Sequence, residues 1–409
     1  MTRHLLRIVW NRRRRNFLIA LEVLLSFLVL VAVATFALQF LQNWRRPLGF
    51  SADRVWVVEF RPSSVADEVR AQNEATLERL LAVLADLDPV EAVAASSSGG
   101  VPYSGSEWGS SVELEDGRAL RYQVGRVTDS FATVMGLRMR AGRWFSREDA
   151  GAAVDPVVLN AQLARDIFGD GDPIGRIIPE SGRPRPDGRI PPPKRVIGVI
   201  DEYRKYGEFS TPYRFLFYRQ DFGNAQPGTA SEIALRVTPG TTARFEETLT
   251  RALRSMAPDW TFEIDTLVAA RESYLRRYTV PLLIGSTIAT FLLIMVALGL
   301  IGVLWQNVTE RTREFGLRRA KGASASHVQQ QVLLELALLT SMAVGIGLLL
   351  VLQLPALPLP PDVWIFTPVV VSAAIAMSIT VIYGLALLCA WYPSRLATKI
   401  QPAEALHYE

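Results

Sequence analysis

A lysine side chain can bind the phosphates of a nucleotide, and the sequence has four lysines: Lys194, Lys205, Lys321 and Lys399. A P-loop needs glycines that let the backbone approach the phosphates, and a lysine directly after the last glycine. None of the four lysines follows a glycine. We therefore expect no Walker-type site, no ATPase activity and no bound cofactor on residues 1–409.

Histidine would serve nucleophilic catalysis or zinc binding, and the sequence has three: His4, His327 and His407. All three fall in segments that we predict below to be cytoplasmic, so a Ser-His-Asp site or a histidine-ligated zinc site is excluded from the large segment 42–279. Carboxylates stand side by side at 148–149 and 246–247, and we interpret both pairs as surface residues. The sequence predicts no catalytic residue and no metal site.

The most charged motif is ERTREFGLRRAKGAS, from Glu310 to Ser324, which lies between two strongly apolar runs. Glu310 with Arg313 and Glu314 with Arg318 have the three- and four-residue spacing of ion pairs on a helix. Gly322 suits a helix end, and Ser324 or Ser326 can cap the next helix, the latter with Gln329 in a capping box. The motif is either a solvated loop or a short structured helix at the membrane face, on which Phe315 and Leu317 would be exposed unless something covers them.

Four long apolar runs frame this motif, at 17–41, 280–305, 333–354 and 366–391. Each is long enough to cross a hydrocarbon core of roughly 30 Å as a helix. A cleaved signal peptide has a shorter apolar core and a small-residue cleavage site, so we interpret the first run as an uncleaved helix. The fold class is a membrane protein with four transmembrane helices and an α+β domain between the first two.

Basic residues set the expected orientation. They precede the first run, separate the second from the third and follow the fourth, whereas the segment between the third and fourth has none. By the positive-inside rule both termini are cytoplasmic, which predicts a multi-pass membrane protein with a large domain on the outer side. The predicted segments are a cytoplasmic interfacial helix 1–16, TM1 17–41, an extracytoplasmic domain 42–279, TM2 280–305, a cytoplasmic loop 306–332, TM3 333–354, an outer loop 355–365, TM4 366–391 and a cytoplasmic tail 392–409.

Segment 42–279 is nearly neutral, with 31 basic and 33 acidic residues, so the basic pI does not indicate nucleic-acid binding. The single cysteine, Cys389, lies in the fourth run, so no disulfide within the chain stabilises this domain.

Strand-helix-strand patterns occur at both ends of the domain: RVWVVEF to VEAVAASS, and SEIALRVT to WTFEIDTL. Two such units predict a ferredoxin-like layer. Residues 100–229 between them are predicted to be a β-rich inserted subdomain, with a hairpin at Asp116-Gly117. Residues 179–195 are rich in proline and arginine, which favours an exposed loop over a contact arm for a partner. The pattern from 266 to 278 is helical and continues into the second apolar run.

Acids within the apolar runs are uncommon, and this chain has Glu22 and Glu335. Both lie near the predicted cytoplasmic interface, where pairing with basic residues or headgroups competes with a functional role.

The charged motif, followed by HVQQQVLLELALLT, resembles the cytoplasmic loop of FtsX/MacB-type ABC permeases. The tail YPSRLATKIQPAEALHYE resembles that family's ending. Three further motifs, SFATVMGLRMRAGRWFSREDA, VVLNAQLARDIFGDGDPIGRII and KRVIGVIDEYRKYG, are similar to the family's extracytoplasmic domain. The resemblance covers nearly the whole chain in order, although RRAKGA replaces a common RKALGA.

The resemblance implies a multi-pass permease subunit of the bacterial inner (cytoplasmic) membrane, with its large domain periplasmic or extracellular. It would work as a dimer with itself or a paralogue, driven by an ABC ATPase subunit holding ATP and Mg. The substrate would be a peptide, toxin, lipoprotein or lipid, and a periplasmic adaptor and an outer-membrane channel are possible partners. The rival is a regulator that transports nothing and relays motion to a cell-wall hydrolase. The residues implied to couple the chain to the ATPase are Glu310, Arg313, Glu314, Phe315, Leu317, Arg318, Arg319, Lys321 and Gly322.

Overall fold

The computed structural model of the chain describes residues 13–97, 99–105, 108–114, 117–179, 192–210, 213–222, 230–310, 324–354 and 366–399. These residues form two compact units. One combines residues 1–42 with 278–409, and we call it the helix unit; the other is residues 43–277, the sheet domain.

Four long helices account for the described part of the helix unit: α2 (Arg13–Trp44), α7 (Leu267–Glu310), α9 (Ala325–Gln353) and α10 (Pro368–Lys399). Each contains a stretch long and apolar enough to span a membrane, as the sequence predicted. The predicted interfacial segment and outer loop lie largely outside the described residues, at 1–12 and 355–365.

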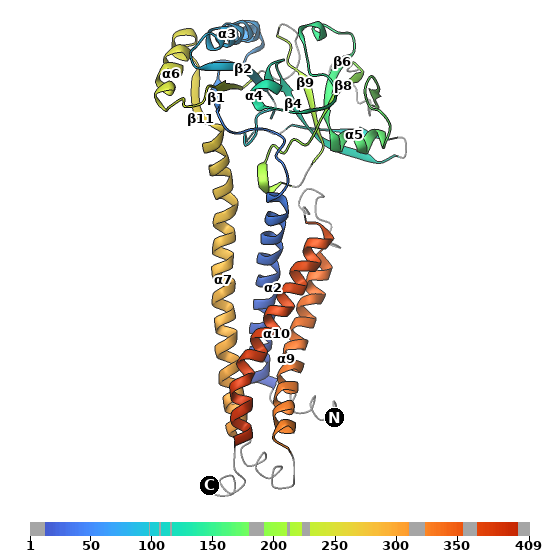
Figure 1. The fold of residues 1–409 in the computed structure, drawn as a ribbon, viewed down its shortest axis with the longest axis vertical. Helices are drawn as coiled ribbons and strands as arrows, with labels where there is room; N and C mark the ends of the chain where they lie inside the picture. The colour runs from blue at the N-terminus through green and yellow to red at the C-terminus, as the bar shows by residue number, and fades with distance from the viewer. Residues whose placement is uncertain are drawn as a thin grey trace. The chain divides into compact units, whose positions relative to one another are not determined.

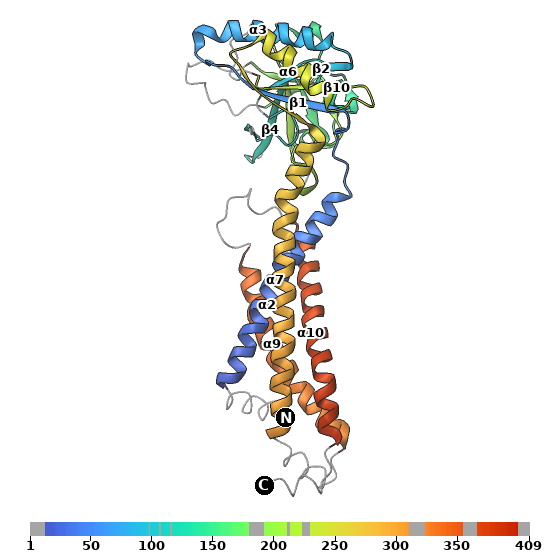
Figure 2. The same cartoon turned by 90° about the vertical axis from the view of Figure 1, so that its left-hand side faces the viewer.

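The four helices of this unit run lengthwise beside one another (Figures 1 and 2), and close contacts between small and large residues hold them together. A Cβ atom on Gly347 of α9 would lie 2.6 Å from the ring of Phe27 on α2, so only glycine allows this approach. Ser341 and Tyr383 share a 2.6 Å hydrogen bond between α9 and α10. Apolar residues elsewhere on the four helices, such as Leu298 and Leu388, are exposed as lipid-facing residues would be.

The sheet domain begins and ends with the two predicted strand-helix-strand units. They are β1 (Val55–Arg61), α3 (Asp67–Ala85) and β2 (Val90–Ser97), then β10 (Glu232–Val237), α6 (Arg244–Met256) and β11 (Thr261–Thr266). The strand order β11-β1-β10-β2, with antiparallel neighbours throughout, confirms the ferredoxin-like layer. Helices α3 and α6 cover one face, where Leu80 and Leu249 pack on Val58 and Leu235.

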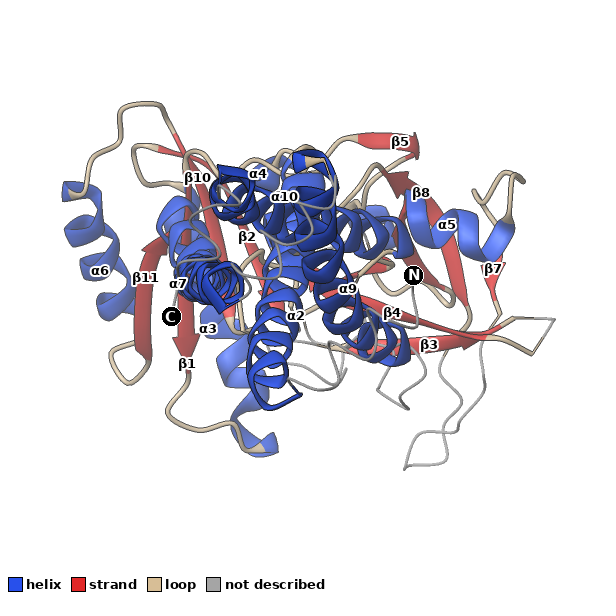
Figure 3. Ribbon diagram, turned by 90° about the horizontal axis from the view of Figure 1, so that it is seen from below, coloured by secondary structure: helices blue, strands red, loops and turns tan. Residues whose placement is uncertain are grey.

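The intervening strands extend the same sheet instead of forming a separate layer, as Figure 3 shows from below. The full order is β11-β1-β10-β2-β4-β9-β6-β8-β5, with β3 on β4 and β7 on β8. These strands are β3 (Gly109–Glu113), β4 (Ala119–Val127), β5 (Met139–Gly142), β6 (Asp155–Asn160), β7 (Ile177–Ile178), β8 (Lys194–Ile200) and β9 (Phe215–Arg219). The predicted hairpin is β3–β4, and 180–191 of the predicted loop lie outside the described residues.

An aromatic core fills the sheet face opposite α3 and α6. Phe131 of α4 (Phe131–Met135) packs with Tyr203, Phe215 and Phe217, all fully buried. On the other side of the extended sheet, α5 (Ala161–Phe168) packs Leu163 against Val157 and Leu159. The chain entering from α2 and the chain leaving into α7 both join the aromatic core, through Phe50 and Leu267.

Candidate functional site

Only one of the nine residues implied to couple the chain to an ATPase lies among the described residues. Glu310 is the last residue of α7, is exposed, and accepts a 2.8 Å hydrogen bond from the Gln306 side chain. The other eight are outside the described residues: Arg313, Glu314, Phe315, Leu317, Arg318, Arg319, Lys321 and Gly322. The motif's last residue, Ser324, caps α9 by accepting a hydrogen bond from the His327 amide.

The other end of α7 lies in the sheet domain. Strand β11 ends at Thr266, and α7 begins at the next residue, with no intervening loop. The Thr266 hydroxyl accepts a hydrogen bond from the Ala269 amide at 3.1 Å, which satisfies one of the free donors of a helix start. The predicted helical continuation before the second apolar run is therefore part of one 44-residue helix.

Residues 201–210, which follow β8 and include the short η2 helix (Gly207–Phe209), reach both helix ends, and we call them the clamp loop. The Arg204 guanidinium is fully buried and donates to the carbonyls of Asn43 at 2.8 Å and Arg46 at 3.1 Å. It also donates to Ser210 at 2.6 Å. Asn43 belongs to the last turn of α2, where carbonyl groups lack helical partners and a cation is favoured. Burial lowers the pKa of Arg204, and Glu202 and Glu208 act against this shift.

Four residues later the clamp loop holds α7. The Arg271 guanidinium donates from Nε to the Glu208 carboxylate at 2.8 Å, and a second bond comes from its Nη2. The Glu208 side chain is 4% exposed, so this ion pair is largely shielded from solvent. Arg271 also lies over the Trp44 ring, 5.9 Å from its centroid. One short loop thus binds the end of α2 and the start of α7.

Tyr103 packs against the clamp loop and the start of α7. Its backbone has a left-handed φ of 61°, and its amide donates to the Lys205 carbonyl at 2.9 Å. Its ring contacts Tyr274 of α7 and Phe50, with centroid distances of 5.6 and 5.8 Å. A Cβ on Gly207 would lie 2.6 Å from this ring, so glycine is needed there. Burial foremost, and then the Glu208 charge, raise the pKa of Tyr103, which keeps the phenol neutral.

A buried carboxyl group lies behind the loop. Glu232 is 3% exposed on the central strand β10, and Lys205 of the clamp loop is 1% exposed. Burial raises the pKa of Glu232 to about 7, while the Lys205 charge and a hydrogen bond with Ser104 act in the opposite direction. The Glu59 carboxylate, directly opposite on β1, adds to the rise. Glu232 therefore changes charge near neutral pH.

The remaining polar candidates have structural partners. Asp149 of the 148–149 pair is buried, so the surface interpretation was wrong for this residue. It accepts two 2.7 Å hydrogen bonds from Arg143 and one at 2.9 Å from the amide of Ser146, which precedes the η1 turn (Arg147–Asp149). Glu335 accepts a 3.3 Å bond from Gln331. Within the described ranges, no group of three His, Cys, Asp or Glu side chains is placed to hold a metal ion.

Sequence reasoning missed the clamp. The motif KRVIGVIDEYRKYG drew attention only as a resemblance, and Arg204, Glu208 and Arg271 were not singled out. The available signal was a short charged cluster directly after a buried, apolar strand, together with an arginine one turn into a long helix. Buried charges of this kind usually have specific partners.

Comparisons with known proteins identify the family of the chain. Residues 17–252 match the family model of the MacB-like periplasmic core domain, and residues 286–402 match that of the FtsX-like permease C-terminal region. "Macrolide export ATP-binding/permease protein MacB" of Chromobacterium violaceum is 30% identical over 304 residues, which are 70% of this chain and 43% of that protein. The protein of the same name from Escherichia coli (strain K12) is 30% identical over 293 residues, 69% of this chain and 43% of the relative. The chain thus spans less than half the length of these relatives.

Two solved structures are more distant. The periplasmic region of MacB from Actinobacillus actinomycetemcomitans is 15% identical with a TM-score of 0.37, covering 57% of this chain and 97% of that one. The extracellular domain of the noncanonic ABC-type transporter YknZ is 16% identical with a TM-score of 0.34, covering 51% and 99%. The first family model alone covers more than half of the 409 residues. The chain therefore belongs to the MacB/FtsX family of ABC transporter permeases, with a MacB-like domain inserted after its first membrane helix.

Proposed function

We propose that the chain is a permease subunit whose ATPase is a separate polypeptide, and that ATP-driven movement passes along α7 into the sheet domain. One observation supports an ATPase outside residues 1–409: none of their four lysines follows a glycine, as a P-loop requires. The name "ATP-binding/permease protein" of the MacB relatives supports an ATPase as the source of the movement.

The 306–332 segment is the proposed docking surface for that ATPase, which would carry ATP and Mg. Phe315 would enter a pocket of the ATPase, and Arg318 and Arg319 would meet carboxylates beside it. The other implied residues would shape the surface, since Glu314 can pair with Arg318 and Gly322 can end the helix.

The observation that carries the proposal is the double attachment of the clamp loop. Arg204 holds the end of α2, and Glu208 holds Arg271 of α7. A tilt of either helix would therefore pull on the clamp loop. That loop continues from β8, and Tyr203 at its start is fully buried in the aromatic core. A movement of the helices would therefore move the sheet as well, because no flexible linker separates them from the clamp loop.

The sheet domain would lie on the extracytoplasmic side of the inner membrane, with both termini in the cytoplasm. Four apolar helices and a MacB-like domain fit an inner-membrane protein. The work would be export or extraction of a peptide, toxin, lipoprotein or lipid by a dimer of this chain, or of this chain with a paralogue. A periplasmic adaptor and an outer-membrane channel would complete an efflux pathway.

The test is to separate ATP hydrolysis from transport. We expect Arg271→Gln, in the complex reconstituted with its ATPase, to retain ATP hydrolysis but lose most substrate movement, because the helix start is released from the clamp loop. Arg254→Gln on the exposed face of α6 is the matched control and should leave both unchanged. Normal transport by Arg271→Gln would refute the role of the clamp. ATP hydrolysis by the isolated chain would refute the permease-subunit proposal.

A further inference from the structure

The edge of the sheet at β11 is open to pairing. In the part of the chain that the structure describes, β11 pairs with β1 only and ends the strand order. Its six residues alternate between exposed and half-buried side chains, with Thr261, Glu263 and Asp265 exposed. An edge strand offers unpaired amide and carbonyl groups to any extended chain that reaches it.

Carboxylates line this edge at an energetic cost. Glu263 lies directly opposite Glu59 on β1, and Glu59 lies directly opposite Glu232 on β10. Like charges directly opposite one another destabilise a sheet, yet three carboxyl groups occupy this one cross-strand row. Among the described ion pairs, none involves Glu59, Glu263 or Asp265. A basic side chain placed beyond Glu263 would extend the row with the opposite charge.

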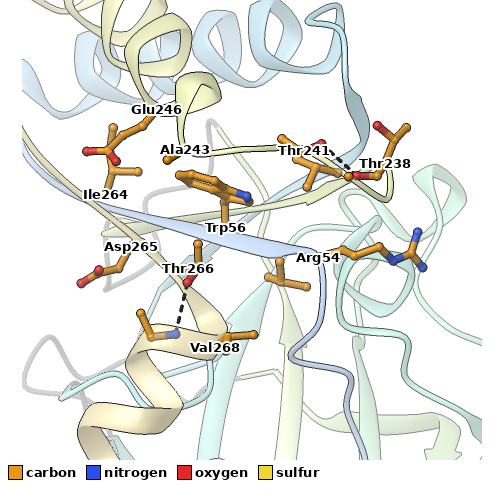
Figure 4. A pocket seen from close by; sticks show the side chains of 14 residues that line it. Arg54, Trp56, Thr238, Thr241, Ala243, Glu246, Ile264, Asp265, Thr266 and Val268 are labelled. Carbon is orange, nitrogen blue, oxygen red and sulfur yellow. Dashed lines mark hydrogen bonds between the residues drawn. The ribbon is translucent and has the colours of Figure 1, made fainter.

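A groove of about 530 Å³ adjoins the last three residues of β11, at the start of α7 (Figure 4). The Trp56 indole, Ile264 and Val268 give it an apolar lining. The carboxylates of Glu246 and Asp265 lie on the same side of it, whereas Arg54 points away and pairs with Glu91 at 3.3 Å. The groove can accept the end of a strand that carries apolar and basic residues.

We propose that the β11 edge is a docking site for an extended, basic segment of a second polypeptide, which adds to the sheet as a further strand. Lysine or arginine at alternate positions would face Glu263 and Asp265. The residues between them would cover Phe262 and Ile264, which pack on the α3 and α6 side of the sheet. A second copy of this chain would not suit the site. If β11 of one copy paired with β11 of another, with the acidic faces on the same side of the sheet, Glu263 or Asp265 would lie opposite another carboxylate or opposite no basic residue. The site does not depend on the proposed function.

The experiment uses the full chain in lipid nanodiscs and a labelled six-residue peptide in which lysine and valine alternate. We expect saturable binding, read by fluorescence anisotropy, and slower hydrogen exchange at β11 amides. Two control peptides separate strand addition from attraction between charges: one has three lysines followed by three valines, and one has alternate amides N-methylated. Equal binding of either control would overturn the proposal, as would no binding of the alternating peptide.

A charge-reversed variant supplies the second arm. Glu263→Lys with Asp265→Lys should weaken binding roughly tenfold or more, because both cross-strand pairs become repulsive. The variant should fold, because it converts the Glu59–Glu263 repulsion into an attraction, and it should bind a peptide of alternating glutamate and valine. Glu68→Lys with Glu78→Lys on exposed positions of α3 is the matched control. Unchanged binding by the β11 variant would contradict the site. Efficient disulfide formation between copies of Glu263→Cys, made in Cys389→Ala, would assign the edge to a second copy and likewise overturn the proposal.

Discussion

Gly49 lies directly against the backbone of Glu202. A Cβ atom built on Gly49 would be 1.6 Å from the Glu202 carbonyl oxygen, and the φ of Gly49 is +85°. Two features therefore require glycine at this position: the left-handed backbone conformation and the lack of space for a Cβ atom. The contact joins the segment after α2 to the clamp loop, two residues before Arg204.

Substitution of Gly49 should open this contact. We expect Gly49→Ala to destabilise the sheet domain by about 3 kcal/mol or more, of which about 1 kcal/mol is backbone strain. The measurement is the Tm of the full chain, followed by near-UV circular dichroism. Gly117→Ala is the matched control, because Gly117 has a φ of +78° but nothing within 4 Å of an added Cβ. Equal losses in the two variants would show that the Glu202 contact contributes nothing.

Arg204 should be more sensitive than an exposed arginine. Arg204→Met keeps much of the apolar volume but removes donors to the carbonyls of Asn43, Arg46 and Ser210. Each lost hydrogen bond from a charged donor is worth about 1.5 to 3 kcal/mol, offset in part because a buried charge is also removed. We expect a lower Tm and faster hydrogen exchange at residues 43–48 than in wild type. Arg251→Met, at an exposed position on α6, should change neither. Unchanged exchange at 43–48 would mean that Arg204 does not hold the end of α2.

Glu232 should give stability a pH dependence in the neutral range. Its pKa in the folded chain is raised, chiefly by burial, from 4.5 to about 7. Its stabilising contribution is full below pH 4.5, where both states are protonated, and declines as pH rises toward 7, because only the unfolded state releases the proton freely. The expected loss over this range is on the order of 2 to 3 kcal/mol.

Glu232→Gln isolates that contribution. The variant stays neutral at every pH, so its Tm should fall less than that of wild type between pH 5 and pH 8. Glu59→Gln, on an exposed neighbour that adds to the pKa shift, should move the wild-type transition to slightly lower pH without removing it. Identical pH profiles for wild type and Glu232→Gln would contradict a buried, titrating Glu232.

Local patterns in the sequence were enough to predict much of the fold. The four apolar runs, the two strand-helix-strand units and the Ser324 cap depend on spacings of a few residues, which are visible along the chain. Leu77, Leu80 and Leu84 of α3 recur at the spacing of one helix face, and all three are buried. The extension of one sheet through β4 and β9 was not predicted, because it depends on which distant strands pair.

The clamp was missed for the same physical reason. Arg204 contacts the Asn43 carbonyl across 161 positions of sequence, and Arg271 contacts Glu208 across 63. A backbone carbonyl has no sequence signature as an acceptor. A charged side chain looks alike in sequence whether it is exposed or buried with partners. Only the folded arrangement distinguishes Arg204 from the exposed arginines of α6.

Orientation in the membrane is a prediction from the distribution of basic residues alone. Single cysteines at Ser181 and Ser324, made in Cys389→Ala, should react with an impermeant thiol reagent from opposite sides of the membrane. Residue 181 should be labelled in intact spheroplasts, and residue 324 only after the membrane is opened. Labelling of both from outside would refute the four-helix topology with cytoplasmic termini.

The last prediction concerns the charged motif at 310–324. We predict that Phe315, which stands between charged residues, enters a pocket of the ATPase, and burying a Phe side chain is worth roughly 1.5 to 3 kcal/mol. Phe315→Ala with Arg319→Glu removes this anchor and reverses one neighbouring charge, but keeps Glu314, Arg318 and Gly322, whose spacing predicts a short helix and its end. We therefore expect normal expression and membrane insertion.

The same double variant should weaken co-purification of the ATPase or abolish transport, and ATP binding by the ATPase should not change. Arg185→Glu, in the proline- and arginine-rich segment of the sheet domain, is the matched charge reversal and should do neither. A Phe315→Ala single variant should show an intermediate loss, because Arg319 still meets its carboxylate partner. If the double variant kept full transport and normal association with the ATPase, the motif would be a solvated loop whose charges serve only to orient the chain in the membrane.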